Sequence, residues 1–237
     1  LMNIALKITS LLLSYPEKEL LDELPELKAA LASSAVPEAV AVALGRLIDD
    51  LTGRDLYEAQ ERYVHLFDRT RALSLHLFEH IHGESRDRGQ AMVDLMALYE
   101  AGGFEIDAKE LPDYLPLFLE FLSTRPRAEA EDLLGQTAHI TEAIGERLRK
   151  RESVYASAFA TLSLLSSAEA DKKLLKELMA APEDNPDDLK ALDRIWEEEA
   201  VTFGGNAGEG ACGPDRLRTR MRAAERQPGD GAGSIPN

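Results

Sequence analysis

Apolar residues recur at helical spacing along almost the whole chain, and this pattern constrains the fold more than any other feature. Residues that favour helices, above all Leu, Ala, Glu, Lys and Arg, dominate the sequence, whereas runs of alternating β-branched residues are missing. No internal repeat of fixed period is visible, so a solenoid is not expected. The sequence therefore predicts an all-α fold, a single helical bundle of about ten helices.

Helix start and stop signals divide this pattern into segments. Pro16 separates the first two helices, and Asp55 is placed to cap a later one. Gly103 follows the end of another helix, and Pro116 should kink a helix or delay its start. After the first two, the expected helices cover residues 37–51, 55–68, 71–82, 85–101, 110–123, 128–149, 153–166, 171–180 and 187–203.

The composition changes at Gly204. The last 34 residues hold 8 of the 16 glycines and three prolines, with almost no periodic apolar pattern. Such a segment cannot bury enough apolar surface to offset the entropy of ordering it. The sequence predicts an all-helical domain over 1–203 and a flexible C-terminal tail over 204–237.

Charge and cysteine content exclude several function classes. The 27 basic and 43 acidic residues give a net charge of −16. This charge argues against nucleic-acid binding and against anionic membrane surfaces, and it favours cationic peptides. The single cysteine, Cys212, excludes an internal disulfide, an all-cysteine zinc site and an iron–sulfur cluster held by this chain alone. Without a signal-peptide pattern or an apolar run of about 18 residues, we expect a cytoplasmic location and no membrane insertion.

Most of the side chains that could bind or react with a ligand lie in the middle third of the chain. Four of the five histidines and nine of the fourteen aromatic residues lie between Tyr57 and Phe121. His76 and His80 match the pattern H-x-x-E-H, which on a helix would let both rings bind zinc with Glu79 as the base of a hydrolase. No third ligand is evident, so we favour surface or core-edge histidines over the zinc alternative.

Two apolar stretches leave a choice between core packing and a binding groove. Tyr63, Leu66 and Phe67 form a helical stripe that either packs in the core or lines a groove for an apolar segment of a partner. Leu77 and Phe78 precede polar residues and allow the same two interpretations. The sequence favours core packing for the first stripe and does not decide for the second.

Charged residues near these stretches also allow two interpretations. Arg86 and Arg88 lie in a segment rich in both signs of charge and either pair with neighbouring acids or anchor a bound peptide. Asp113 and Tyr114 precede Pro116. Either Asp113 caps a helix beside a packed Tyr114, or both face a cleft where Asp113 binds a basic side chain.

The stretch YVHLFDRTRALSLHLFEHIHGESRDRGQAMVDLMALYEAGG (63–103), followed by ELPDYLPLFLEFLS (110–123), resembles the respiratory nitrate reductase assembly chaperones of the delta-subunit, or NarJ, type. The segments LLLSYP (11–16), IWEEE (195–199) and VTF (201–203) are similar to the same family. These proteins are all-helical redox-enzyme maturation chaperones.

The resemblance implies a function that is not enzymatic. It implies a chaperone that binds the N-terminal segment of the apo nitrate reductase alpha subunit, which is the catalytic subunit. It also implies a role in molybdenum cofactor insertion and contact with molybdenum cofactor biosynthesis proteins, with no cofactor of its own. A regulatory adaptor for an unrelated partner is the remaining alternative. The residues to which the resemblance assigns peptide binding are Tyr63, Leu66, Phe67, Phe78, Glu79, His80, Arg86, Arg88, Asp113 and Tyr114.

Overall fold

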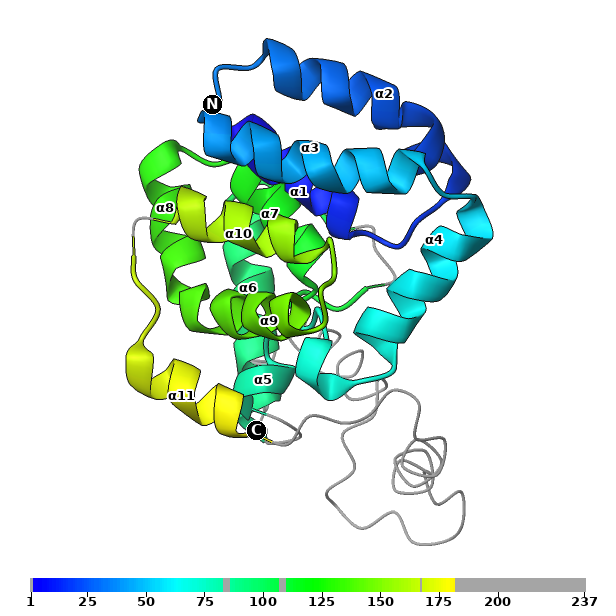
Figure 1. Cartoon of the computed structure of the whole chain (residues 1–237). Coiled ribbons are helices and arrows are strands. Elements are labelled where there is room, and N and C mark those ends of the chain that lie inside the picture. Colours follow the sequence, from blue (N-terminus) through cyan, green and yellow to red (C-terminus); the bar gives the residue numbers. More distant parts are fainter. Residues whose placement is uncertain (1, 83–85, 107–109, 167, 182–237) are drawn as a thin grey trace, which may run out of the picture. The chain divides into compact units, whose positions relative to one another are not determined.

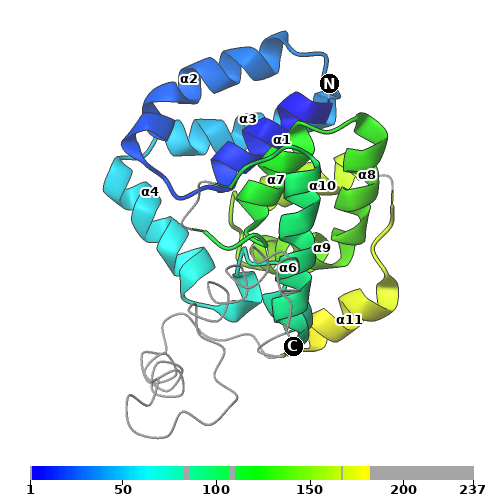
Figure 2. The same cartoon turned by 180° about the vertical axis from the view of Figure 1, so that it is seen from behind.

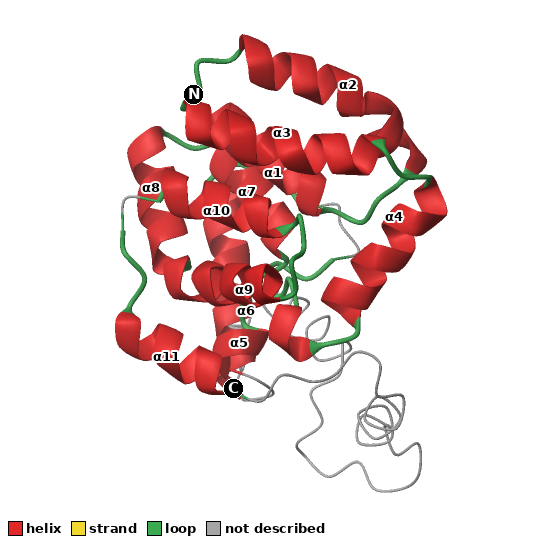
Figure 3. Ribbon diagram, viewed as in Figure 1, coloured by secondary structure: helices red, strands yellow, loops and turns green. Residues whose placement is uncertain are grey.

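The computed structural model describes residues 2–82, 86–106, 110–166 and 168–181. Within these residues every regular element is a helix, and one isolated bridge is the only β pairing (Figure 3). The prediction of an all-α fold is confirmed. The helix expected over 187–203 and the tail 204–237 lie outside the described residues. Contacts divide the chain into Leu1–Ile195 and Trp196–Asn237, and all described residues belong to the first unit.

Eleven α-helices, one π-helix and one 3-10 helix make up the described part. They are α1 (Met2–Leu13), α2 (Lys18–Ser33), α3 (Glu38–Thr52), α4 (Leu56–Tyr63), the π-helix η1 (Val64–Asp68), the 3-10 helix η2 (Arg71–Leu73), α5 (Glu79–His82), α6 (Arg86–Ala101), α7 (Leu115–Ser123), α8 (Arg127–Gln136), α9 (Ala138–Lys150), α10 (Ala156–Leu165) and α11 (Lys172–Ala180).

The core forms where α1, α7 and α10 meet. α1 packs along α7, and α10 contacts both α3 and α9, while α2 covers α3 (Figures 1 and 2). Most residues of α1 are buried, among them Leu6 and Leu12. Even its polar Ser10 lies inside and donates to the carbonyl of Pro116 at 2.6 Å. None of the described helices has the length and apolar character that crossing a membrane requires.

Local signals in the sequence set several helix ends as predicted. Asp55 accepts a hydrogen bond from the amide of Glu58, whose side chain reaches back to the amide of Asp55, which forms a capping box. Gly103 follows α6 with a φ of +68°, in the region that favours glycine. Pro116 lies in the first turn of α7, so it delays the start of this helix, as one of the two predicted alternatives states.

Two predicted helices are interrupted. The helix expected over 55–68 leaves α geometry after Tyr63 and continues as the π-helix η1. The long helix expected over 128–149 is divided between α8 and α9 at Thr137. The hydroxyl of Thr137 donates to the carbonyl of Leu134 at 2.9 Å, and this local bond competes with the regular helix.

The helix predicted over 71–82 is wrong. Only the short η2 and α5 are helical there, and the residues between them include an isolated bridge from His76 to Tyr114. Backbone groups of this segment bond to residues that precede and begin α7. This pairing replaces the helical hydrogen bonds that the local pattern predicts.

Candidate functional site

Two segments that are far apart in the sequence, around His76 and around Tyr114, pair in an antiparallel bridge. The amide of Leu77 donates to the carbonyl of Asp113 at 3.0 Å. On the other side of the bridge, the amide of Leu115 donates to the carbonyl of Leu75 at 2.8 Å. The bridge therefore places two sequence motifs, the residues around Phe78 and the residues that precede α7, side by side.

Asp113 is fully buried, and its carboxylate has partners within the chain. Its oxygens accept from the amide of Phe78 at 3.0 Å and lie 3.2 Å from Nδ1 of His76 and 3.9 Å from Nη2 of Arg88. Arg88 also contacts Glu79 at 3.3 Å. The hydrogen bond from Asp113 raises the pKa of His76 above its ordinary value, although burial opposes the shift.

Asp113 therefore caps the amide at the start of α5 and holds three segments together. In this arrangement its contacts are internal, and it does not face solvent. The geometry resembles the predicted capping alternative, except that Asp113 caps α5 rather than its own helix.

Arg88 also forms ion pairs within the fold. Its partners among the described residues include Glu79 and Asp113. Its Nε is buried and has no hydrogen-bond partner. Arg86 is the first residue of α6, and its side chain lies outside the described part.

Three tyrosines meet beside the bridge. The hydroxyl of Tyr63 donates to the carbonyl of Leu13 at 2.9 Å and lies 2.8 Å from the hydroxyl of Tyr114. The rings of Tyr15 and Tyr63 pack edge to face with centroids 5.6 Å apart. Tyr63 is buried, Tyr114 is partly buried and Tyr15 is 43% exposed, so this cluster extends from the core to the surface.

The charges of two carboxylates act on the pKa of Tyr114. Burial raises the pKa of Tyr114 to about 12, and the charges of Glu110 and Asp68 add to the effect. Burial and the charge of Glu110 likewise raise the pKa of Asp68. We call Tyr15, Tyr114, Asp68 and Glu110 the tyrosine face. It combines exposed aromatic surface with negative charge, which suits a segment that is both apolar and basic.

The other predicted groove residues differ in exposure. Leu66 and Phe67 are 6% and 4% exposed. The ring of Phe67 packs against Tyr63 and Tyr155 with centroids 4.9 Å and 5.1 Å away. Leu66 and Phe67 therefore pack in the core, as one of the two predicted alternatives states, and they do not line an open groove.

Phe78, Glu79 and His80 are partly buried around the start of α5. The ring of Phe78 packs edge to face against His82 with centroids 5.8 Å apart. Nε2 of His80 lies 2.8 Å from the carbonyl of Ser74, and burial lowers the pKa of His80. These three residues therefore form a partly open edge, next to the bridge.

The zinc hydrolase alternative is wrong because its helix does not exist. His76 lies in the bridge and contacts Asp113, whereas His80 lies in α5 and contacts a carbonyl. Among the residues that the structure describes, no group of three or more His, Cys, Asp or Glu side chains is arranged to hold a metal ion.

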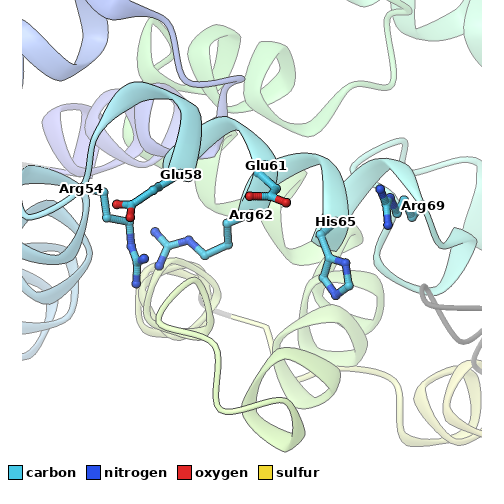
Figure 4. A pocket seen from close by; sticks show the side chains of 6 residues that line it. All are labelled: Arg54, Glu58, Glu61, Arg62, His65 and Arg69. Carbon is cyan, nitrogen blue, oxygen red and sulfur yellow. The ribbon is translucent and has the colours of Figure 1, made fainter.

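A hollow that the sequence interpretation missed lies along α4 and η1, and Figure 4 shows the side chains that line it. Its volume is about 340 Å³. Asp50 binds both Arg54 and Arg62 there, at 3.0 Å and 2.5 Å. The sequence does carry a signal for this hollow. Its charged residues recur at helical spacing, opposite the apolar stripe of Tyr63, Leu66 and Phe67. The lining residues are Arg54, Glu58, Glu61, Arg62, His65 and Arg69.

Comparison with known proteins gives a consistent result. The family model of the nitrate reductase delta subunit matches residues 33–161, which include α3 to α9, the bridge, Tyr63 and Tyr114. A nitrate reductase molybdenum cofactor assembly chaperone, NarJ of Escherichia coli (strain K12), is 45% identical over 222 residues, which cover 92% of each chain. NarJ of Bacillus subtilis (strain 168) is 32% identical over 154 residues, 65% of this chain and 83% of that one.

The fold has a counterpart among solved structures. The crystal structure of an Archaeoglobus fulgidus protein assigned to redox enzyme maturation superposes with a TM-score of 0.51 and 24% sequence identity, over 70% of this chain and 94% of that chain. This likeness concerns the fold alone. The family match and the identity to the E. coli relative show that the chain belongs to the nitrate reductase delta subunit family.

Proposed function

We propose that this protein is an assembly chaperone for a respiratory nitrate reductase, acting in the cytoplasm and not as an enzyme. The observation that carries the proposal is the 45% identity, over 92% of both chains, to a protein named as a nitrate reductase molybdenum cofactor assembly chaperone. In this role it binds the N-terminal segment of the apo alpha subunit while the molybdenum cofactor is inserted. Contact with the molybdenum cofactor biosynthesis proteins belongs to the same proposal.

The tyrosine face supports the binding step. Tyr15 and Tyr114 offer partly exposed aromatic surface to apolar side chains. The charges of Asp68 and Glu110 act on Tyr114 and would complement basic side chains of a bound segment. The net charge of −16 adds long-range attraction for a cationic segment. Binding is therefore expected to weaken as the salt concentration rises.

Calorimetric titration with a peptide from the N-terminus of the alpha subunit tests the proposal. Tyr114→Ala is expected to weaken binding by about tenfold, because an aromatic side chain at an interface often contributes more than 1 kcal/mol. Tyr57→Ala is the matched control, because Tyr57 is 81% exposed on α4 and is not part of the tyrosine face. Absence of binding by the unmodified chain would refute the proposal.

A cellular test separates the proposed client from an unrelated one. The chain is expected to co-purify with the alpha subunit from cells grown anaerobically with nitrate. Its deletion should leave the reductase without molybdenum cofactor. Normal cofactor content in the deletion strain would contradict the assembly role.

A further inference from the structure

α11 lies at the surface of the described part. None of its nine residues is buried, and it packs mainly on α9. Figures 1 and 2 show it on the outside of the bundle, with its C-terminal end beside α5. Asp171 caps its N-terminus by accepting from the amides of Lys173 and Leu174 at 2.8 Å and 3.0 Å. A helix this short is marginal by itself, so its stability depends on its seat against α9.

The seat contains a buried arginine that binds the end of α11. Arg147 of α9 is 2% exposed. Its Nη2 donates to the carbonyl of Leu178 in α11 at 2.6 Å, and its Nη1 donates to the carbonyl of Ala72 in η2 at 2.9 Å. The Leu178 side chain packs against the core. One guanidinium thus joins α11 to the segment that leads into the bridge.

The same arginine acts on the predicted site. Burial is the largest cause of the lowered pKa of His80, and the positive charge of Arg147 lowers it further. Arg147 therefore contacts α11 and also acts electrostatically on His80 at the partly open edge.

The sequence of α11 has the character of a ligand for an acidic protein. Three lysines lie in its first five residues, and its partly buried apolar residues, Leu175, Leu178 and Met179, fall on one side of the helix. Leu178 faces the core while Leu174 is 40% exposed. The sequence that combines these features is KKLLKELMA.

We propose that α11 occupies a docking seat for an amphipathic helix of the partner subunit, one that is basic at its N-terminal end and apolar on one face. The proposal rests on the proposed function, because the partner helix would belong to the segment that the chaperone binds. In the free chain α11 fills the seat. When the partner binds, its helix replaces α11 on α9, and a carbonyl of that helix accepts the hydrogen bond that Arg147 gives to Leu178.

Replacement is favourable only because α11 can leave at small cost. It buries no residue completely, as expected of an element with low local stability. A filled seat reduces the apparent affinity for the partner by the fraction of molecules in which α11 is docked. Weakening the docking of α11 should therefore tighten binding.

Titration of the full chain with the N-terminal peptide of the alpha subunit tests this prediction. Leu178→Ala removes the apolar anchor of α11 and should lower the dissociation constant by about fivefold. Leu174→Ala, on the exposed side of the same helix, is the matched control and should leave the dissociation constant unchanged. Melting of both variants is measured to show that the bundle is intact.

Hydrogen exchange gives a second measurement. Amides of residues 172–180 should exchange faster when the peptide is bound, because α11 has left its seat. If the unmodified chain binds the peptide but Leu178→Ala binds equally or more weakly, or if α11 becomes more protected, the docking proposal is overturned while the proposed function stands. If the unmodified chain binds no peptide, the proposed function fails and the docking proposal fails with it.

Discussion

Replacing Asp113 should lower stability more than any other single change at the bridge. Its buried carboxylate accepts from the amide of Phe78 and contacts His76 and Arg88. Removing one partner of a buried charged pair costs about 3–5 kcal/mol. The side chains of His76 and Arg88 are 26% and 21% exposed, so water shields part of the effect. We therefore expect Asp113→Ala to lower the free energy of unfolding by about 3 kcal/mol.

Asp113→Asn isolates the contribution of the charge. The amide oxygen can still accept from Phe78, so the expected loss is smaller, about 2 kcal/mol. The pKa of His76 is raised in the folded chain above its ordinary value of 6.5. The stability that its charged form contributes is therefore complete below pH 6.5 and is lost as the pH rises through the folded pKa. The difference in unfolding free energy between the unmodified chain and Asp113→Asn should therefore shrink as the pH rises.

Urea unfolding followed by circular dichroism measures both effects. With a slope of about 2 kcal/mol/M, the midpoint for Asp113→Ala should fall by about 1.5 M. Asp22→Asn is the control, because Asp22 is an exposed carboxylate paired with Lys18, and its midpoint should not change. The reasoning is refuted if Asp113→Ala behaves like this control, or if the difference for Asp113→Asn grows with pH.

Three further changes test the core, a close helix contact and the tail. Phe67→Ala should cost about 3–5 kcal/mol of unfolding free energy in denaturant titration, and a cost below 1 kcal/mol would contradict its place in the core. A Cβ on Gly145 would lie 3.0 Å from Cβ of Phe159, so Gly145→Ala should lower the melting temperature. Gly45→Ala, which meets nothing within 4 Å, should hold or raise it, and equal behaviour of the two variants would count against the contact. Deletion of 204–237 should leave the melting temperature nearly unchanged, since a segment of that composition adds little to a core; a drop of many degrees would show that the tail is docked.

The sequence predicted those parts of the fold that local chemistry decides. The cap at Asp55 and the stop at Gly103 each depend on neighbouring residues only. The break at Thr137 was missed although Gly135 lies two residues before it, because a single glycine inside a helical pattern does not by itself end a helix. The hydroxyl of Thr137 bonds to a carbonyl of its own turn, which helps to end α8 there.

The segment 71–82 could not be predicted from its own residues. Its apolar spacing fits a helix, but the backbone of Leu77 bonds to Asp113, a residue far along the chain. For the same reason Asp113 and Tyr114 were recognised as candidates, as were Tyr63, Phe78 and Arg88, while the contacts that join them were not. Arg147 was missed altogether, since nothing in a helical pattern shows which arginine will be buried.

The bridge between His76 and Tyr114 closes the intervening residues into a loop whose base is fixed by backbone bonds. The length of that loop is therefore uncoupled from the geometry at its base. The cost of closing a longer stretch rises only with the logarithm of its size. Phe104 and Ile106 of this stretch pack against the core, so its length is free to vary only where these two residues are spared.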